Sequence, residues 1–322
     1  MPPTISVVIP TYKRPYLIKR VIQSVFNQTY QNFEIVIVDD SPDNETEKVV
    51  NNLQDKRIKY IHTKTKTNPA RARNRGVKES SPDSKYIAFL DDDDQYFPLF
   101  LEKTIKRLEE KKELTFVTTY AELRTQKGEK LPKIHGKLGE FWTIAAGNGC
   151  VLRKEIFTKQ NIWYDETIVF EDLDLGFRIL QNPHNKAESI PEVLYVFYCY
   201  PSVKGESQPT SFTPEAQLGA IENFTTFTQE TSSEEIEYFY KKHGQAYQKI
   251  GRKPVAWLCS LTGNRLCLSG EIEKGRSYFL KACLTYPHPR YLLYYLISLF
   301  FPGLFQNIRL KILKQKIFRG KI

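Results

Sequence analysis

Four consecutive aspartates in this chain of 322 residues are the first candidates for a chemical role. They are Asp91, Asp92, Asp93 and Asp94, and they follow the apolar segment 86–90. Adjacent carboxylates repel one another, and a divalent cation placed among them relieves the repulsion. Mg²⁺ and Mn²⁺ prefer oxygen ligands and commonly combine a few carboxylates with phosphate oxygens. The run therefore indicates a site for a divalent metal and a phosphorylated ligand, and a solvated acidic turn is the alternative.

Two further acidic groups stand at similar positions. Asp39 ends a second apolar segment, where it could accept a hydrogen bond from a ligand or cap the following helix. Glu171 and Asp172 begin a predicted helix over 173–180. Carboxylates at the start of a helix are common for electrostatic reasons alone. A carboxylate held there could also accept a proton from an attacking hydroxyl.

Three arginines, Arg71, Arg73 and Arg75, fall within about one helical turn after a predicted strand. Guanidinium groups match phosphates and base edges well. The alternative is an ordinary basic helix face.

The elements that must position these residues alternate between strand and helix. Short β-branched segments predict strands at 5–10, 33–40, 58–62, 86–90 and 114–120, and helices are expected at 15–27, 43–53, from Pro69 and from Pro98. Such alternation predicts an α/β fold with a mostly parallel sheet and helices on both faces. Ligands bind beyond the carboxyl ends of the strands in sheets of this kind. The acidic groups should therefore gather at one edge.

Five motifs follow in a fixed order: VVIPTYKR (7–14), IVDDS (37–41), ARARNRG (70–76), FLDDDD (89–94) and FEDLD (170–174). Together they resemble the inverting, non-processive, bacterial-type glycosyltransferases of family 2, over roughly residues 3–200. The resemblance implies the GT-A fold, a Rossmann-like sheet flanked by helices. It also implies a divalent metal, Mn²⁺ or Mg²⁺, as cofactor.

The resemblance assigns roles to individual residues. The donor nucleotide would contact Pro10, Thr11, Tyr12, Arg14, Asp39 and Arg71. The Asp-x-Asp motif of the family maps to Asp91, toward the ribose and sugar, and Asp93, on the metal, with Asp91 also counted as a metal ligand. Asp92 and Asp94 offer the same chemistry, so the register is ambiguous by one residue. Asp172 would be the catalytic base beside Glu171, and Asn148 would lie in a loop near donor and acceptor.

The resemblance also implies a reaction. Direct displacement at the anomeric carbon would transfer a sugar from a nucleotide-sugar donor, with a UDP-sugar favoured, to a hydroxyl of a carbohydrate or lipid-linked acceptor. The Q-x-x-R-W motif of processive members is absent, so a single sugar would be added, in cell-surface glycan or glycolipid synthesis. Many relatives carry Arg or His after the last strand. Here Lys204 could replace it as a phosphate contact.

Two other functions fit parts of the pattern. A GT-A domain could bind a nucleotide-sugar without turnover, but the joint presence of Asp91, Asp93 and Asp172 argues against this. A nucleotidyltransferase would also use metal-binding aspartates on a parallel sheet. It would be expected to carry a glycine-rich loop after the first strand, and residues 10–15 contain no glycine.

The C-terminal part differs in character. We predict a GT-A domain over 1–212 and a helical region over 213–322. This region contains an apolar segment at 291–305 and a tail at 306–322 with six basic residues and no acidic one. An apolar segment beside a cationic one fits attachment to an anionic membrane surface. The alternative is that the apolar segment packs onto the helical region and the tail is solvated.

Composition restricts location and partners. The formal charge is +10, yet no recognised nucleic-acid-binding module accounts for it, so we expect no nucleic-acid partner. The five cysteines are odd in number, which favours free thiols in a reducing compartment. No signal peptide and no apolar stretch of spanning length is evident. We expect a cytoplasmic protein that attaches peripherally to the inner face of the cell membrane.

Overall fold

The computed structural model describes residues 2–130, 146–167, 171–199 and 271–300, and the separate helical residues 256, 259–260, 262–263 and 266–267. The chain divides into two compact units, one made of Met1–Arg124 and Gly128–Tyr198 and the other of Thr125–Lys127 and Cys199–Ile322. The predicted boundary between residues 212 and 213 lies outside the described residues and stays a prediction.

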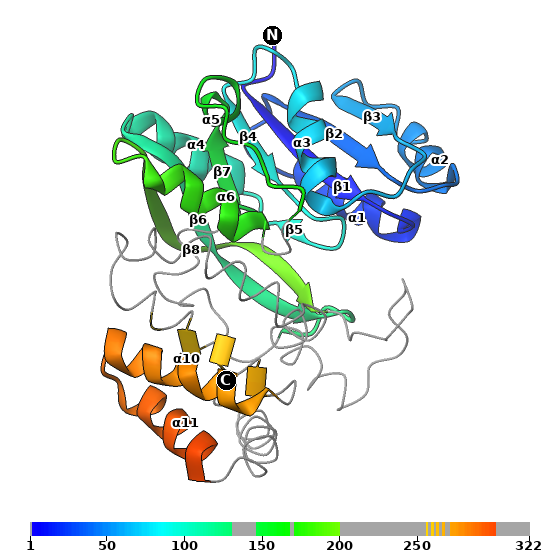
Figure 1. The fold of residues 1–322 in the computed structure, drawn as a ribbon. Coiled ribbons are helices and arrows are strands. Elements are labelled where there is room, and N and C mark those ends of the chain that lie inside the picture. Colours follow the sequence, from blue (N-terminus) through cyan, green and yellow to red (C-terminus); the bar gives the residue numbers. More distant parts are fainter. Residues whose placement is uncertain are drawn as a thin grey trace. The chain divides into compact units, whose positions relative to one another are not determined.

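An eight-stranded sheet forms the centre of the first unit (Figure 1). Four neighbouring strands are parallel, in the spatial order β3 (Ile58–His62), β2 (Phe33–Asp39), β1 (Ile5–Thr11) and β4 (Tyr86–Phe89). These are four of the five predicted strands. Strands β1, β2 and β4 are buried almost throughout, which is the reason they read as apolar runs, whereas β3 is only partly buried.

The second half of the sheet is mixed. It adds, in spatial order, β7 (Cys150–Arg153), β6 (Leu114–Thr125), β8 (Lys186–Cys199) and β5 (Gln95–Tyr96). The pairs β4–β7, β6–β7 and β5–β8 are antiparallel. The α/β prediction is confirmed, but the sheet is less parallel than strand–helix alternation suggested, because β5 and β7 are too short to stand out in the sequence.

Helices cover both faces of the sheet, as predicted. In β1, Ile5, Val7 and Ile9 belong to one buried cluster and Val8 to the other, as the two-residue period of a strand requires. The first cluster is completed by α1 (Pro15–Phe26), α2 (Glu45–Asn51) and α4 (Phe100–Glu110). The second is completed by α3 (Pro69–Glu79), α5 (Glu155–Thr158) and α6 (Glu171–Gln181).

Helix α3 is held at a defined height above the sheet. It begins at Pro69, as predicted, and the side chain of Asn68 accepts a hydrogen bond from the backbone N–H of Arg71 at 2.9 Å. Gly76 brings the helix close to β1, because a Cβ there would stand 2.3 Å from Cγ1 of Val8. By contrast, α4 begins at Phe100 and not at the predicted Pro98.

In the continuously described part of the second unit, residues 271–300, α10 (Ile272–Thr285) packs on α11 (Pro289–Phe300). The rings of Phe279 and Tyr294 meet with centroids 5.6 Å apart, inside a small apolar cluster. Within the described residues, no helix is long and apolar enough to cross a membrane. Among the described residues, Cys150, Cys259, Cys267 and Cys283 are not joined in disulfides.

Candidate functional site

The polar ends of several strands meet at one edge of the sheet. In the parallel register Thr11 pairs with Asp39 and Val8 pairs with Phe89, so the residues that follow β1, β2 and β4 lie at the same level. Strand β7 runs antiparallel to β4, and Asn148 just before it forms a bridge with Phe89. The sheet therefore brings segments that are far apart in the sequence to the aspartates.

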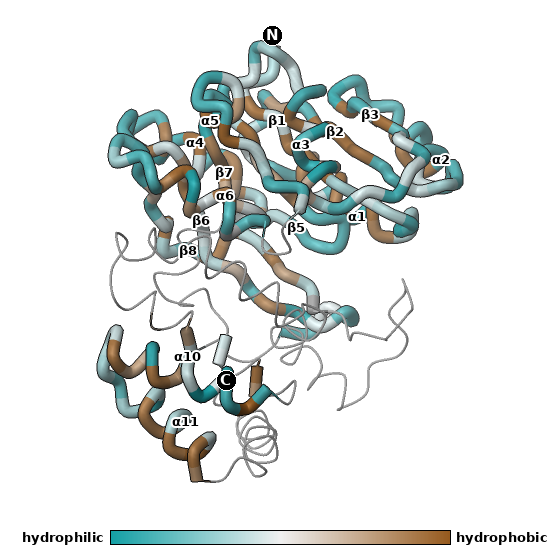
Figure 2. Tube along the Cα trace, in the orientation of Figure 1, coloured by the Kyte–Doolittle hydropathy of each residue, from teal (hydrophilic) through white to brown (hydrophobic). Residues whose placement is uncertain are grey.

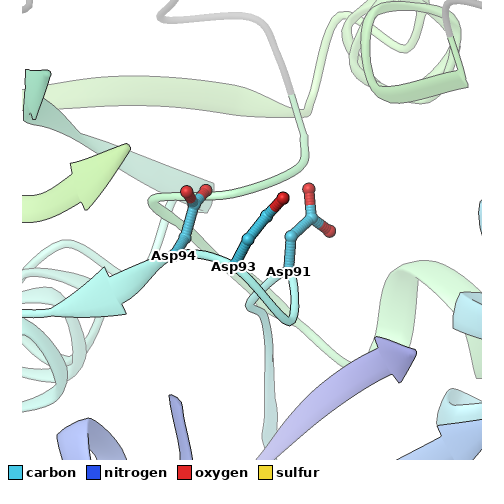
Figure 3. A group of neighbouring side chains, drawn as sticks. All are labelled: Asp91, Asp93 and Asp94. Carbon is cyan, nitrogen blue, oxygen red and sulfur yellow. The ribbon is translucent and has the colours of Figure 1, made fainter. Parts of the chain in front are cut away.

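The four aspartates divide into a group of three and one separate residue. Carboxylate oxygens of Asp91, Asp93 and Asp94 all lie within 4.8 Å of one another, and the three side chains extend from one turn (Figure 3). Asp92 is engaged elsewhere, accepting hydrogen bonds from Thr11 Oγ1 at 2.7 Å and from Arg14 Nη1 at 2.9 Å. Asp92 thus links the loop of aspartates to the end of β1, and which of the four aspartates bind a metal stays a prediction.

Burial makes the group electrostatically costly. Burial raises the pKa of Asp93 to about 7, with neighbouring Asp92 adding to the rise and Arg14 opposing it. Burial also raises the pKa of Asp94 well above its ordinary value, and the charges of Asp93 and Asp91 act in the same direction. A cation among these oxygens would favour the ionised carboxylates. The donor set, all oxygen and rich in charge, fits Mg²⁺ or Mn²⁺.

Asn148 joins two of these carboxylates. Its Nδ2 donates to Asp91 at 2.7 Å and to Asp94 at 2.8 Å, while its Oδ1 accepts the backbone N–H of Asp91 at 3.1 Å. The second oxygen of Asp94 accepts the backbone N–H of Tyr198 at 2.9 Å. The residue predicted to lie near donor and acceptor therefore belongs to the scaffold of the acidic group.

Arg73 connects the acidic group to the predicted base. Its side chain is 4% exposed and donates to Asp91 at 2.8 Å and to Glu171 at 2.7 Å, and it lies 3.5 Å from Oδ1 of Asp172. The family resemblance pointed to Arg71, but that side chain pairs with Glu166 at 2.8 Å and is 61% exposed. The motif indicated a functional arginine, and helical phase decides which one faces the site. Arg71 as a donor contact remains a prediction.

Asp172 lies in an environment that raises the pKa of its carboxyl group. Burial raises the pKa of Asp172 to about 7, while Arg73 lowers it and Glu171 raises it further. Its Oδ1 has no hydrogen-bond partner among the described residues. Gly147 packs against it so closely that a Cβ on this glycine would stand 2.0 Å from Oδ2. Sequence reasoning missed Gly147, for which the only signal was its place in the Gly-Asn-Gly motif 147–149.

The other predicted donor residues lie at the ends of β1 and β2. Pro10 is half-buried, and the ring of Tyr12 has Lys13 Nζ at 5.5 Å and Lys66 Nζ at 5.1 Å from its centroid. Asp39 is 0% exposed and accepts hydrogen bonds from the backbone N–H of Ser41 and from Tyr60 Oη. A carboxylate oxygen can accept a second bond, so its contact with a base stays a prediction. Lys204 lies outside the described residues.

Comparisons of this sequence with known proteins point to one family. The model of the family Glycosyl transferase family 2 matches residues 6–182. An uncharacterized glycosyltransferase of Rickettsia conorii is 42% identical over 42% of this chain and 22% of its own length. A Campylobacter jejuni GalNAc(5)-diNAcBac-PP-undecaprenol beta-1,3-glucosyltransferase is 38% identical over 29% of this chain and 30% of its own length. This chain thus spans a fifth to a third of the length of these curated relatives.

Solved structures share the fold. S. aureus TarS 1-349, determined in complex with UDP-GlcNAc, aligns with a TM-score of 0.57 at 16% identity, covering 98% of this chain and 92% of that chain. The mannosyltransferase PcManGT from Pyrobaculum calidifontis, in complex with GDP-Man and Mn²⁺, aligns with a TM-score of 0.52 at 13% identity, covering 96% of this chain and 87% of that chain. At this identity the likeness concerns the fold, which is GT-A.

Proposed function

This chain belongs to glycosyl transferase family 2, and on that premise we propose that it transfers a single sugar from a nucleotide-sugar to an acceptor hydroxyl with inversion. One observation carries the proposal. A carboxylate with a raised pKa, Asp172, is joined through one buried guanidinium, Arg73, to a group of carboxylates suited to a divalent metal. A base and a leaving-group site are the two parts that a direct displacement requires.

Asp91, Asp93 and Asp94 would hold the metal, which would supply positive charge to the departing diphosphate. Their oxygens already lie within reach of one cation, and the presence of Mn²⁺ in the PcManGT complex supports this assignment. Asn148 would keep Asp91 and Asp94 in place through its two hydrogen bonds.

Asp172 would accept the proton of the acceptor hydroxyl as its oxygen attacks the anomeric carbon. Its raised pKa suits a base that works near neutral pH. Arg73 would hold Glu171 and offset part of the negative charge of the carboxylates around it. On the donor side, Arg14 forms ion pairs with Asp92 and Asp93. The ring of Tyr12, with Lys13 and Lys66 beside it, would offer the nucleotide a positively charged surface.

The substrates are proposed by class. A UDP-sugar is favoured as donor, and the UDP-GlcNAc complex of TarS supports that choice. A carbohydrate or lipid-linked acceptor is favoured, and the undecaprenol-linked name of the Campylobacter jejuni relative supports it. We place the reaction in cell-surface glycan synthesis, at the cytoplasmic side of the membrane.

The test is donor binding and slow donor hydrolysis across a panel of nucleotide-sugars, each with Mn²⁺ and with EDTA. We expect one donor to bind and turn over only when metal is present. Asp93→Ala should lose this metal-dependent binding and turnover. Asp43→Ala is the matched control, because Asp43 is an exposed aspartate outside the acidic group. Tight binding without turnover, even with acceptors, would favour a non-catalytic binding protein, and the absence of any binding would refute the proposal.

A further inference from the structure

Helix α11 presents an apolar face to solvent. Its exposed large side chains are Leu292, Leu293, Leu296, Leu299 and Phe300, at 51%, 51%, 38%, 37% and 66% exposure. At about 100° of rotation per residue these five positions fall within roughly 120° of the helix circumference. We call them the apolar face of α11. Figure 2 shows how strongly hydrophobic this helix is.

The opposite side of α11 holds the helix in its unit. Tyr291 and Tyr294 are 9% exposed and Ser298 is 0% exposed. The carbonyl of Ser298 accepts a hydrogen bond from Arg276 Nη2 on α10 at 3.0 Å, and Tyr294 packs on Phe279. Helix α11 therefore packs on α10 through the side opposite its apolar face. These contacts fix how α11 is rotated about its own axis.

Exposed apolar area is concentrated on this helix pair. Among the described residues, ten large hydrophobic side chains are exposed, and eight of them belong to α10, α11 or their connection. The three outside α11 are Leu280, Leu284 and Tyr286, with Leu284 at 76%. Exposed apolar side chains that are concentrated on one helix pair mark an interaction surface more often than singly scattered ones do.

The sequence that follows α11 identifies the partner. Residues 306–322 carry six basic side chains and no acidic one. Apolar side chains beside a run of like positive charge match a surface that is apolar below and anionic above, which is the interface of an anionic bilayer. A protein partner with a merely apolar surface would leave this charge without a counterpart.

We propose that the apolar face of α11 inserts into the headgroup boundary of an anionic lipid bilayer, with the helix in the membrane plane, and that the positive charge of the sequence 306–322 favours anionic lipids. This proposal sharpens the predicted membrane contact of 291–322 to one helix face and does not rest on the sugar transfer proposed above.

The experiment is co-sedimentation of the full chain with vesicles of phosphatidylcholine containing about a third of phosphatidylglycerol. We expect wild type to pellet, Leu293→Glu/Leu296→Glu to bind at least about tenfold more weakly, and added salt to weaken binding. Leu99→Glu is the matched control, since Leu99 has the same 38% exposure as Leu296 but lies in the first unit. It should pellet like wild type.

Two results would overturn the proposal. The first is unchanged pelleting of the double variant, with its fold verified by circular dichroism. The second is a wild-type dimer that ignores vesicles and becomes monomeric in the double variant, which would assign the face to a second copy of the chain. Because no donor is present, failure here leaves the glycosyltransferase proposal untouched, and failure of donor binding leaves this result standing.

Discussion

Gly147 and the carboxylate of Asp172 touch so closely that no side chain fits between them. A Cβ on Gly147 would stand 2.0 Å from Oδ2 and 2.2 Å from Cγ of Asp172. The backbone N–H of neighbouring Ala146 also donates to the carbonyl of Asp172 at 3.0 Å. The segment before β7 thus forms a wall that fixes where the proposed base can lie.

Gly147→Ala is expected to displace the Asp172 side chain and lower turnover by about 10²-fold, because a displacement of about 1 Å is enough for such a loss. Donor affinity should change little, since the acidic group is not touched. Steady-state kinetics and donor titration measure the two effects. Lys159→Ala is the control, because the side chain of Lys159 is 77% exposed and pairs with Glu155 on the surface. Equal losses in both variants would contradict this role of Gly147.

The rate of transfer should depend on the ionisation of Asp172. Burial raises the pKa of Asp172 from 3.8 to about 7, and a base works only when deprotonated. We expect kcat/KM to rise with pH by about tenfold per unit on the acid side and to level off near pH 7. A pH–rate profile at fixed metal concentration measures this. A flat profile between pH 5.5 and 8 would exclude Asp172 as the base.

Arg73→Met should lower turnover and move that acidic limb to higher pH. The positive charge of Arg73 lowers the pKa of Asp172, so its removal raises that pKa. Arg73→Lys keeps the positive charge but not the forked geometry of the guanidinium. It should return the acidic limb of the pH–rate profile close to its wild-type position, while the rate recovers less. Arg75→Met is the control on the same helix, because Arg75 is 56% exposed and pairs with Glu79. An unshifted limb in Arg73→Met would show a purely structural role.

Asp172→Asn should abolish turnover yet raise the free energy of unfolding at pH 8. A carboxyl whose pKa is raised on folding contributes stability below pH 3.8, and that stability is lost as the pH rises through about 7. The amide cannot ionise, so the variant escapes this loss. Urea denaturation of both proteins at pH 5 and pH 8 tests it. A variant less stable than wild type at pH 8 would contradict the raised pKa.

Much of the first unit could be predicted from the sequence because its signals are local. The apolar runs of β1, β2 and β4 are buried in the sheet, and Asn68 with Pro69 starts α3 by local capping chemistry. The same locality explains the weak points. Strand β5 has two residues and β7 has four, and at that length neither period nor propensity is visible.

The sequence by itself determined the chemistry: carboxylates at strand ends, an arginine-rich helix start and an acidic pair that begins another helix. Which side chains meet was decided only by the tertiary structure. Arg73 and not Arg71 reaches Asp91 because helical phase turns one side chain inward and the next one outward. Gly147 meets Asp172 because the segment before β7 contacts the first turn of α6, where the backbone N–H of Ala146 donates to the carbonyl of Asp172, and such a non-local contact leaves no trace in the spacing of residues.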